Sequence, residues 1–136
     1  MNGNVDAFVA GVGTGGTLLG VALALKEINP DVKIIAVEPI ESAVLSGGIS
    51  GNHRISGIGE GFIPQIVKEN RSLINEVVTV KSRDAIAMSN KLARKHGILV
   101  GISSGANVLV ARKIAKKYKN VVTVLPDRGE RYLSIG

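Results

Sequence analysis

The chain has 136 residues, 45% of them hydrophobic, which suits one globular domain built around a single core. It contains no cysteine, which excludes disulfides and thiolate metal sites. Its apolar stretches are too short to span a bilayer, and residues 1–10 lack the pattern of a secretory signal. We therefore expect a cytoplasmic protein. The net charge of +6 raises the question of nucleic acid, but the basic residues are spread along predicted helices without interleaved aromatic residues, and we expect no nucleic-acid partner.

Strands and helices alternate along the chain. Runs rich in Val and Ile predict four strands, at residues 5–12, 33–37, 76–80 and 120–125. Helical spacing predicts three helices, over 18–28, from an N-cap at Ser82 to a stop near Gly97, and from about 103 to 118. Residues 40–75 are less regular. The alternation predicts an α/β fold, a three-layer αβα sandwich with a mainly parallel sheet.

A glycine-rich loop follows the first predicted strand. Gly11, Gly13 and Gly16 fit the G-x-G-x-x-G pattern of a dinucleotide site, between a strand and a helix. Glu38 ends the next strand, where a dinucleotide-binding fold keeps its ribose-binding acid. An NAD-binding module using 11–16 and Glu38 is therefore one interpretation.

The same loop also suits a single phosphate group. In Gly13, Thr14, Gly15, Gly16 and Thr17 the glycines allow successive amides to converge on an anion, at the start of a helix. The two threonines add hydroxyl donors to the same anion. A pyrophosphate is approached mainly by bare backbone, so this composition favours a lone phosphate.

A second helix start carries small and hydroxyl residues, in the run GISSGAN at 101–107. Both helix starts are expected at the carboxyl edge of the sheet, where open α/β folds bind ligands. A phosphorylated ring placed there would hold its phosphate on residues 13–17 and its far nitrogen on a serine hydroxyl.

Five motifs in sequence resemble those of cysteine synthase, the O-acetylserine sulfhydrylase family of fold-type II pyridoxal-phosphate enzymes. They are AGVGTGGT (10–17), VEP (37–39), GIGEGFIP (57–64), GILVGISSGAN (97–107) and LPDRGERYLS (125–134). The resemblance covers essentially the whole chain, in the family's order and with similar spacing.

The resemblance implies pyridoxal 5'-phosphate as cofactor, with its phosphate on residues 13–17 and its pyridine nitrogen on Ser103. It implies an amino-acid substrate beside Gly57 and Ile58. The implied reaction is β-replacement, in which O-acetylserine and sulfide give cysteine and acetate. It also implies a homodimer and, as in relatives, recognition of the C-terminal tail of serine acetyltransferase.

The family's Schiff-base lysine lies in a segment without a counterpart among these residues. None of the ten lysines stands in a matching context, so we assign no catalytic residue. No grouping of His and carboxylate residues has metal-ligand spacing, so we expect no metal. We expect residues 1–136 to be a single cofactor-binding domain without the catalytic-lysine domain, inactive alone and prone to form homo-oligomers. A non-catalytic interaction module is a further alternative.

Overall fold

A computed structural model describes residues 4–12, 16–48, 51, 53, 55, 58, 63 and 65–126; for Gly16 and Thr17 it describes the backbone only. In chain order the elements are β1 (Ala7–Gly11), α1 (Gly16–Ile28), β2 (Lys33–Pro39), the short 3₁₀ helix η1 (Ile40–Ser42), α2 (Gln65–Glu69), η2 (Arg71–Leu73), β3 (Glu76–Val80), α3 (Ser82–His96), α4 (Ile102–Ile114) and β4 (Val121–Thr123). The four predicted strands are confirmed, and the helical segments of the irregular middle were not foreseen.

The described strands form one parallel sheet in the order β3-β2-β1-β4. Ala7 pairs with Lys33 of β2 and with Val121 of β4, so β1 is hydrogen-bonded on both sides. Each connection between successive strands returns over one face of the sheet to the edge where the previous strand began, so the strands run parallel. Such a crossover usually contains a helix.

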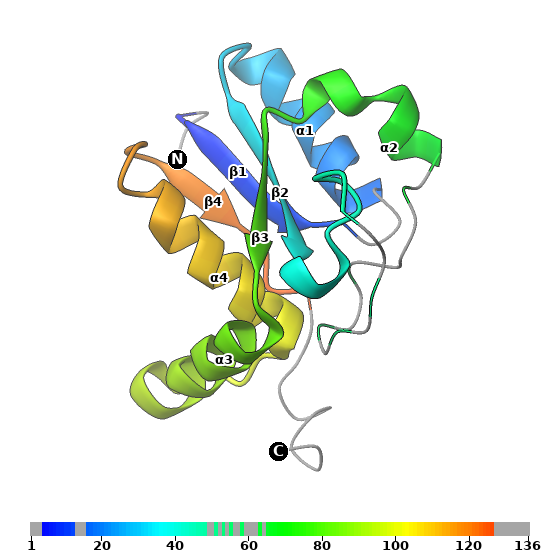
Figure 1. The fold of residues 1–136 in the computed structure, drawn as a ribbon. Coiled ribbons are helices and arrows are strands. Elements are labelled where there is room, and N and C mark those ends of the chain that lie inside the picture. The colour runs from blue at the N-terminus through cyan, green and yellow to red at the C-terminus, as the bar shows by residue number, and fades with distance from the viewer. Residues whose placement is uncertain are drawn as a thin grey trace.

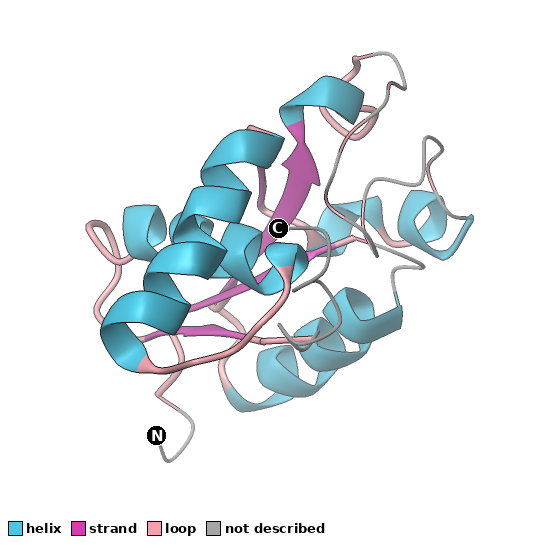
Figure 2. Cartoon of the chain, turned by 90° about the horizontal axis from the view of Figure 1, so that it is seen from below, coloured by secondary structure: helices cyan, strands magenta, loops and turns pink. Residues whose placement is uncertain are grey.

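Helices cover both faces of the sheet, as predicted. Figure 1 shows α1 and α2 on one side of the strands and α3 and α4 on the other, and Figure 2 shows the same two layers from below. Because side chains alternate along a strand, Phe8 and Ala10 face the α1 side while Ala7 and Val9 face the α4 side. The fold is therefore a three-layer αβα sandwich.

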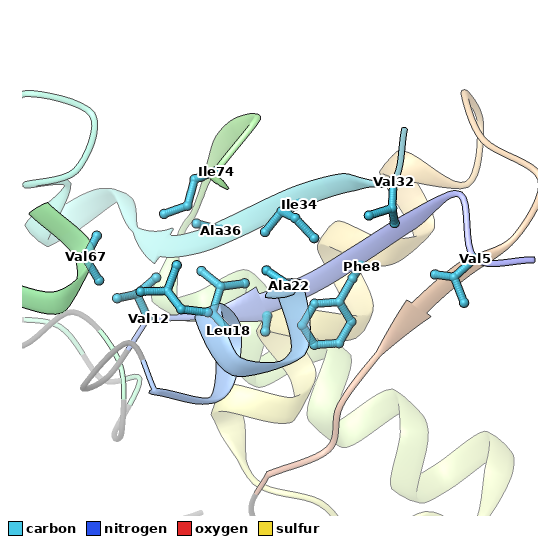
Figure 3. Packing of buried hydrophobic residues seen from close by; sticks show 12 residues of the cluster. Val5, Phe8, Val12, Leu18, Ala22, Val32, Ile34, Ala36, Val67 and Ile74 are labelled. Carbon is cyan, nitrogen blue, oxygen red and sulfur yellow. The ribbon is translucent and has the colours of Figure 1, made fainter. Parts of the chain in front are cut away.

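The α1 side holds the larger of two apolar clusters on the sheet. Phe8, Leu18 and Ile34 pack between β1, β2 and α1 and are at most 1% exposed (Figure 3). Val67 of α2 and Ile74 extend this cluster. The short α2 is held by Val67, its one buried residue, rather than by its own length.

The predicted helix ends are close to those observed, with one correction. Gly97 ends α3 in the left-handed conformation, at φ 65°, and its N–H bonds the Ala93 carbonyl, as a glycine stop requires. Ser82, predicted to be the N-cap of α3, is instead its first residue; the N-cap is Lys81, without a side-chain cap. The Ser82 hydroxyl bonds Glu41, a residue distant in sequence.

Candidate functional site at the carboxyl edge of the sheet

The helix α3 begins at the carboxyl edge of the sheet, and so do α1 and α4, which form a pair on opposite faces. α1 starts at Gly16, soon after β1 ends. α4 runs against the strands: Asn120, just before β4, bonds Asp6 at the opposite edge, so Ile102 lies near the strand ends. Neither helix has an acidic residue in its first turn. The positive ends of both dipoles therefore point to one edge without a neutralising carboxylate.

Part of the predicted phosphate loop lies outside the described residues. Gly13, Thr14 and Gly15 belong to that part, whereas the backbones of Gly16 and Thr17 form the first turn of α1. The helix start that the phosphate interpretation needs is present.

Ser103 lies in the first turn of α4 and is 3% exposed. The next two residues of that turn, Ser104 and Gly105, are small and buried, and the N-cap Gly101 carries no side-chain cap. A hydroxyl at a helix N-terminus that lacks a carboxylate can donate a hydrogen bond to a neutral or anionic acceptor, such as a ring nitrogen. This arrangement fits pyridoxal phosphate.

Asn107 is a buried polar residue of this helix to which its sequence pattern assigned no role. It lies one turn after Ser103 and is 1% exposed. Its Nδ2 donates to the Val124 carbonyl at 3.1 Å, which ties α4 to the end of β4. Its buried Oδ1 has no hydrogen-bond partner within the described chain. Asn107 is the last residue of the motif GISSGAN, but an asparagine inside a predicted helix is usually assigned to the exposed face of that helix.

Ile58 is brought to the end of β1. It is 6% exposed and packs with Val9 and Val37 on the α4 side of the sheet. A Cβ on Gly11, the last residue of β1, would collide with the Ile58 side chain. The close approach explains the glycine and places Ile58 over the end of β1. Gly57, the other predicted substrate contact, lies outside the described residues.

Glu38 does not have the environment of a ribose-binding acid. It is 2% exposed, and its carboxylate accepts the N–H groups of Leu45 and Ser46 at 2.8 and 2.9 Å and the Ser46 hydroxyl at 2.6 Å. These donors occupy both carboxylate oxygens. The NAD-binding alternative is therefore not favoured, because its ribose acid is engaged in holding the turn after η1.

Glu41 caps α3 from outside the helix. Its carboxylate accepts the Ser82 N–H and the Ser82 hydroxyl, each at 3.0 Å. Burial acts to raise the pKa of Glu41, but these hydrogen bonds and the nearby His53 outweigh it and lower the pKa below its usual value. The pair joins the end of β2 to the start of α3, and sequence reasoning missed it because the partners are 41 positions apart.

The lysines do not supply a buried amine. None of the ten side chains is buried, and Lys26 donates to the Val32 carbonyl at 3.1 Å. A Schiff-base lysine must be desolvated to act as a nucleophile. Among the described residues no group of three His, Asp or Glu side chains lies close enough to hold a metal ion. In the same part of the chain no helix is long and apolar enough to cross a membrane.

The fold and the edge together define an α/β protein of the open parallel-sheet class, which binds its ligand at the strand ends. Residues 1–127 match the family model for pyridoxal-phosphate-dependent enzymes. The chain belongs to this family, whose cofactor is pyridoxal phosphate.

Sequence relatives narrow the comparison to cysteine synthases. The chain is 51% identical to cysteine synthase B of Campylobacter jejuni, with 98% of this chain and 44% of that protein covered. It is 50% identical to cysteine synthase of Staphylococcus aureus, with 96% and 42% covered. The chain thus spans less than half the length of these relatives.

Solved structures agree. O-acetyl serine sulfhydrylase isoform 3 from Entamoeba histolytica superposes with a TM-score of 0.93 at 46% identity, over 98% of this chain and 40% of that one. The O-acetylserine-dependent cystathionine beta-synthase from Helicobacter pylori gives 0.91 at 42% identity, over 98% and 44%. The predicted fold class and family are confirmed.

Proposed function

We propose that this chain is the cofactor-phosphate-binding part of a cysteine synthase, which converts O-acetylserine and sulfide to cysteine and acetate. The observation that carries the proposal is the pair of helix N-termini, of α1 and α4, that meet one sheet edge without an acidic residue. The cysteine synthase relatives, which are 51% and 50% identical in sequence to this chain, support the choice of reaction.

The residues of this edge would divide the work of holding the cofactor. Amides and hydroxyls of Gly13, Thr14, Gly15, Gly16 and Thr17 bind the phosphate dianion, assisted by the α1 dipole. The Ser103 hydroxyl donates to the pyridine nitrogen, and being neutral it leaves that nitrogen without a full positive charge. When bound, pyridoxal phosphate supplies the electron sink for elimination at the β-carbon.

The substrate side would be formed by the backbone of Gly57 and Ile58. Ile58 is anchored by its buried side chain against the end of β1, so its backbone has a fixed position relative to the strand ends. A buried anchor next to a binding backbone positions the amino acid and excludes water.

Ligand titration tests the assignment of the phosphate loop. We expect phosphate and pyridoxal phosphate to bind and NAD not to bind. Gly15→Asp should weaken phosphate binding by at least about tenfold, because a carboxylate repels the dianion. Gly20→Asp adds the same charge to α1 at a position where a Cβ meets nothing within 4 Å, and it should leave the affinity unchanged. Equal affinities for the two variants contradict the assignment, and NAD binding would favour the dinucleotide alternative.

We infer that these residues alone do not complete the reaction, because no lysine is placed to react with the cofactor aldehyde. The prediction is that the isolated chain, loaded with pyridoxal phosphate, forms no cysteine from O-acetylserine and sulfide. Borohydride reduction followed by peptide mapping should label no single lysine. Stoichiometric labelling of one specific lysine would overturn this inference.

We propose that the chain forms homo-oligomers and, in the whole protein, recognises the C-terminal tail of serine acetyltransferase. Exposed apolar side chains on several elements support association: Leu23 is 55% and Ile28 64% exposed on α1, and Leu99 is 53% exposed after α3. Sedimentation velocity should show a dimer or larger species. A monomer that binds a peptide of the acetyltransferase tail without any cofactor would favour the interaction-module alternative.

A further inference from the structure

A pocket lies between α3 and α4, away from the carboxyl-edge site. It has a volume of about 230 Å³ and is lined by Met88, Lys91, Leu92, His96, Val108 and Arg112. The four α3 residues share one face of that helix, and Val108 and Arg112 are one turn apart on α4. Figure 1 shows these two helices side by side on the α4 side of the sheet. The pocket is therefore built by a helix pair rather than by a loop.

The floor of the pocket is apolar and firmly packed. Met88 and Leu92 are 8% and 9% exposed and form a small apolar cluster with Val100, against which Val108 packs. Beside it, α3 is tied to the segment that precedes α4, since the buried Ser89 hydroxyl donates to the Val100 carbonyl at 2.8 Å. Because the floor of the pocket is already packed in place, a ligand can bind there without rearrangement of the chain.

The rim of the pocket is cationic, and no acidic residue is among those that line the pocket. Lys91 is half-buried, and Arg112 and His96 are exposed. Arg83 pairs with Asp84 at 4.0 Å, but both are exposed and neither lines the pocket. Asp84 is the single acidic residue of α3, and α4 contains none. The negative end of α3 is also capped, because the Gly97 and Ile98 N–H groups bond the Ala93 and Leu92 carbonyls.

We propose that this pocket binds a small organic anion with a short apolar tail, of which an aliphatic monocarboxylate is the simplest example. The Arg112 guanidinium and the Lys91 ammonium would hold the head group, and Met88, Leu92 and Val108 would cover the tail. Ligand pockets commonly exceed about 300 Å³, so this one limits the tail to a few carbons. A second copy of the chain is a poorer occupant, because a twofold contact would press Lys91 and Arg112 against their own equivalents.

Titration of the isotope-labelled chain with hexanoate tests the proposal. We expect saturable shifts of the amide signals of the lining residues, with weaker binding of acetate, which lacks the tail. Hexylamine, with the same tail and the opposite charge, should cause no such shifts. The double variant Lys91→Gln/Arg112→Gln should lose at least about tenfold in hexanoate affinity.

The matched control is Lys95→Gln/Lys113→Gln, which removes two exposed cations from the same helices outside the pocket. It should bind hexanoate as the parent chain does. Circular dichroism would confirm that both double variants are folded. Absence of saturable hexanoate binding, shifts elsewhere in the molecule, or equal losses in the two variants would each overturn the proposal. The test is independent of pyridoxal phosphate, since no residue of the carboxyl-edge site is changed.

Discussion

At the scale of single residues, Gly105 marks a close approach of α3 and α4. A Cβ there would collide with the Ala85 carbonyl and would lie 2.9 Å from the Ser89 nitrogen and 3.1 Å from its Cβ. The obstacles are mostly backbone of the facing helix, so no side-chain rotation relieves them. Gly105 therefore sets the separation of the helix pair that carries both Ser103 and the basic pocket.

We expect Gly105→Ala to lower the free energy of unfolding by about 1–3 kcal/mol, because the helices must move apart. Gly20→Ala is the matched control, an exposed glycine in α1 whose added methyl group meets nothing within 4 Å. It should raise the free energy of unfolding by up to about 1 kcal/mol, since alanine is the better helix former. Urea unfolding of the two variants measures the difference. Similar stabilities would contradict the close approach.

Asn107 acts at the same scale but through hydrogen bonding. Asn107→Ala removes the donor to the Val124 carbonyl and should lower the free energy of unfolding by about 1–2 kcal/mol. Asn107→Asp replaces the amide donor by a carboxylate and should cost more, because it places a charge at a position that is 1% exposed. Thermal or urea unfolding checks the order. An aspartate variant as stable as the parent chain would show that a donor faces the unpaired Oδ1.

At the scale of elements, α3 shows how a helix start is completed by a residue from elsewhere. Its own N-cap, Lys81, offers no side-chain acceptor, and Glu41 from η1 accepts the Ser82 N–H in its place. A carboxylate at this end also meets the positive end of the helix dipole. The interaction fixes α3 relative to the end of β2.

The lowered pKa of Glu41 gives this interaction a pH dependence. A carboxyl group whose folded-state pKa lies below its usual value of 4.5 stabilises the fold above that value and loses the contribution as the pH falls through the folded-state pKa. Glu41 is exposed, so the contribution is less than about 1 kcal/mol. Glu41→Gln should be slightly less stable at pH 7 and should lose less stability than the parent chain on acidification below pH 4.5.

Stability curves from urea unfolding at several pH values would measure that difference. Glu27→Gln removes a carboxylate that is exposed on α1 and should keep the parent pH profile. If both variants follow the same profile, Glu41 is not the acid-sensitive cap.

At the scale of the whole molecule, local patterns were enough to predict the layers but not the contacts between them. Apolar runs and a glycine stop predicted the four strands and the C-terminal end of α3, because burial on both faces and a left-handed glycine leave strong local signals. The motif order led to the cofactor family, which the relatives confirm. The Glu41 cap and the Asn107 link join residues that only the fold brings together, and no single-sequence periodicity marks them.

β4 is the strand that depends most on such long-range contacts. It pairs with β1 alone over three residues, and all three are only half-buried, whereas Val9 and Ile35 at the centre are at most 1% exposed. The Thr123 hydroxyl donates to the Val9 carbonyl at 2.7 Å, and the Asn107 amide holds the Val124 carbonyl. Side chains thus supply bonds that a longer strand would obtain from its backbone.

We therefore expect β4 to open without unfolding the rest of the sheet. In native-state hydrogen exchange, the β4 amides should exchange at least about tenfold faster than those of β1 and β2. Thr123→Val keeps the shape of the side chain but removes the donor to Val9, and it should speed exchange in β4 while leaving β2 unchanged. Equal protection of all strands, and an equal response to the substitution, would mean that the sheet opens only as one unit. In that case the start of α4, which Asn107 ties to the end of β4, and the sheet edge beside Ser103 would be as rigid as the central strands.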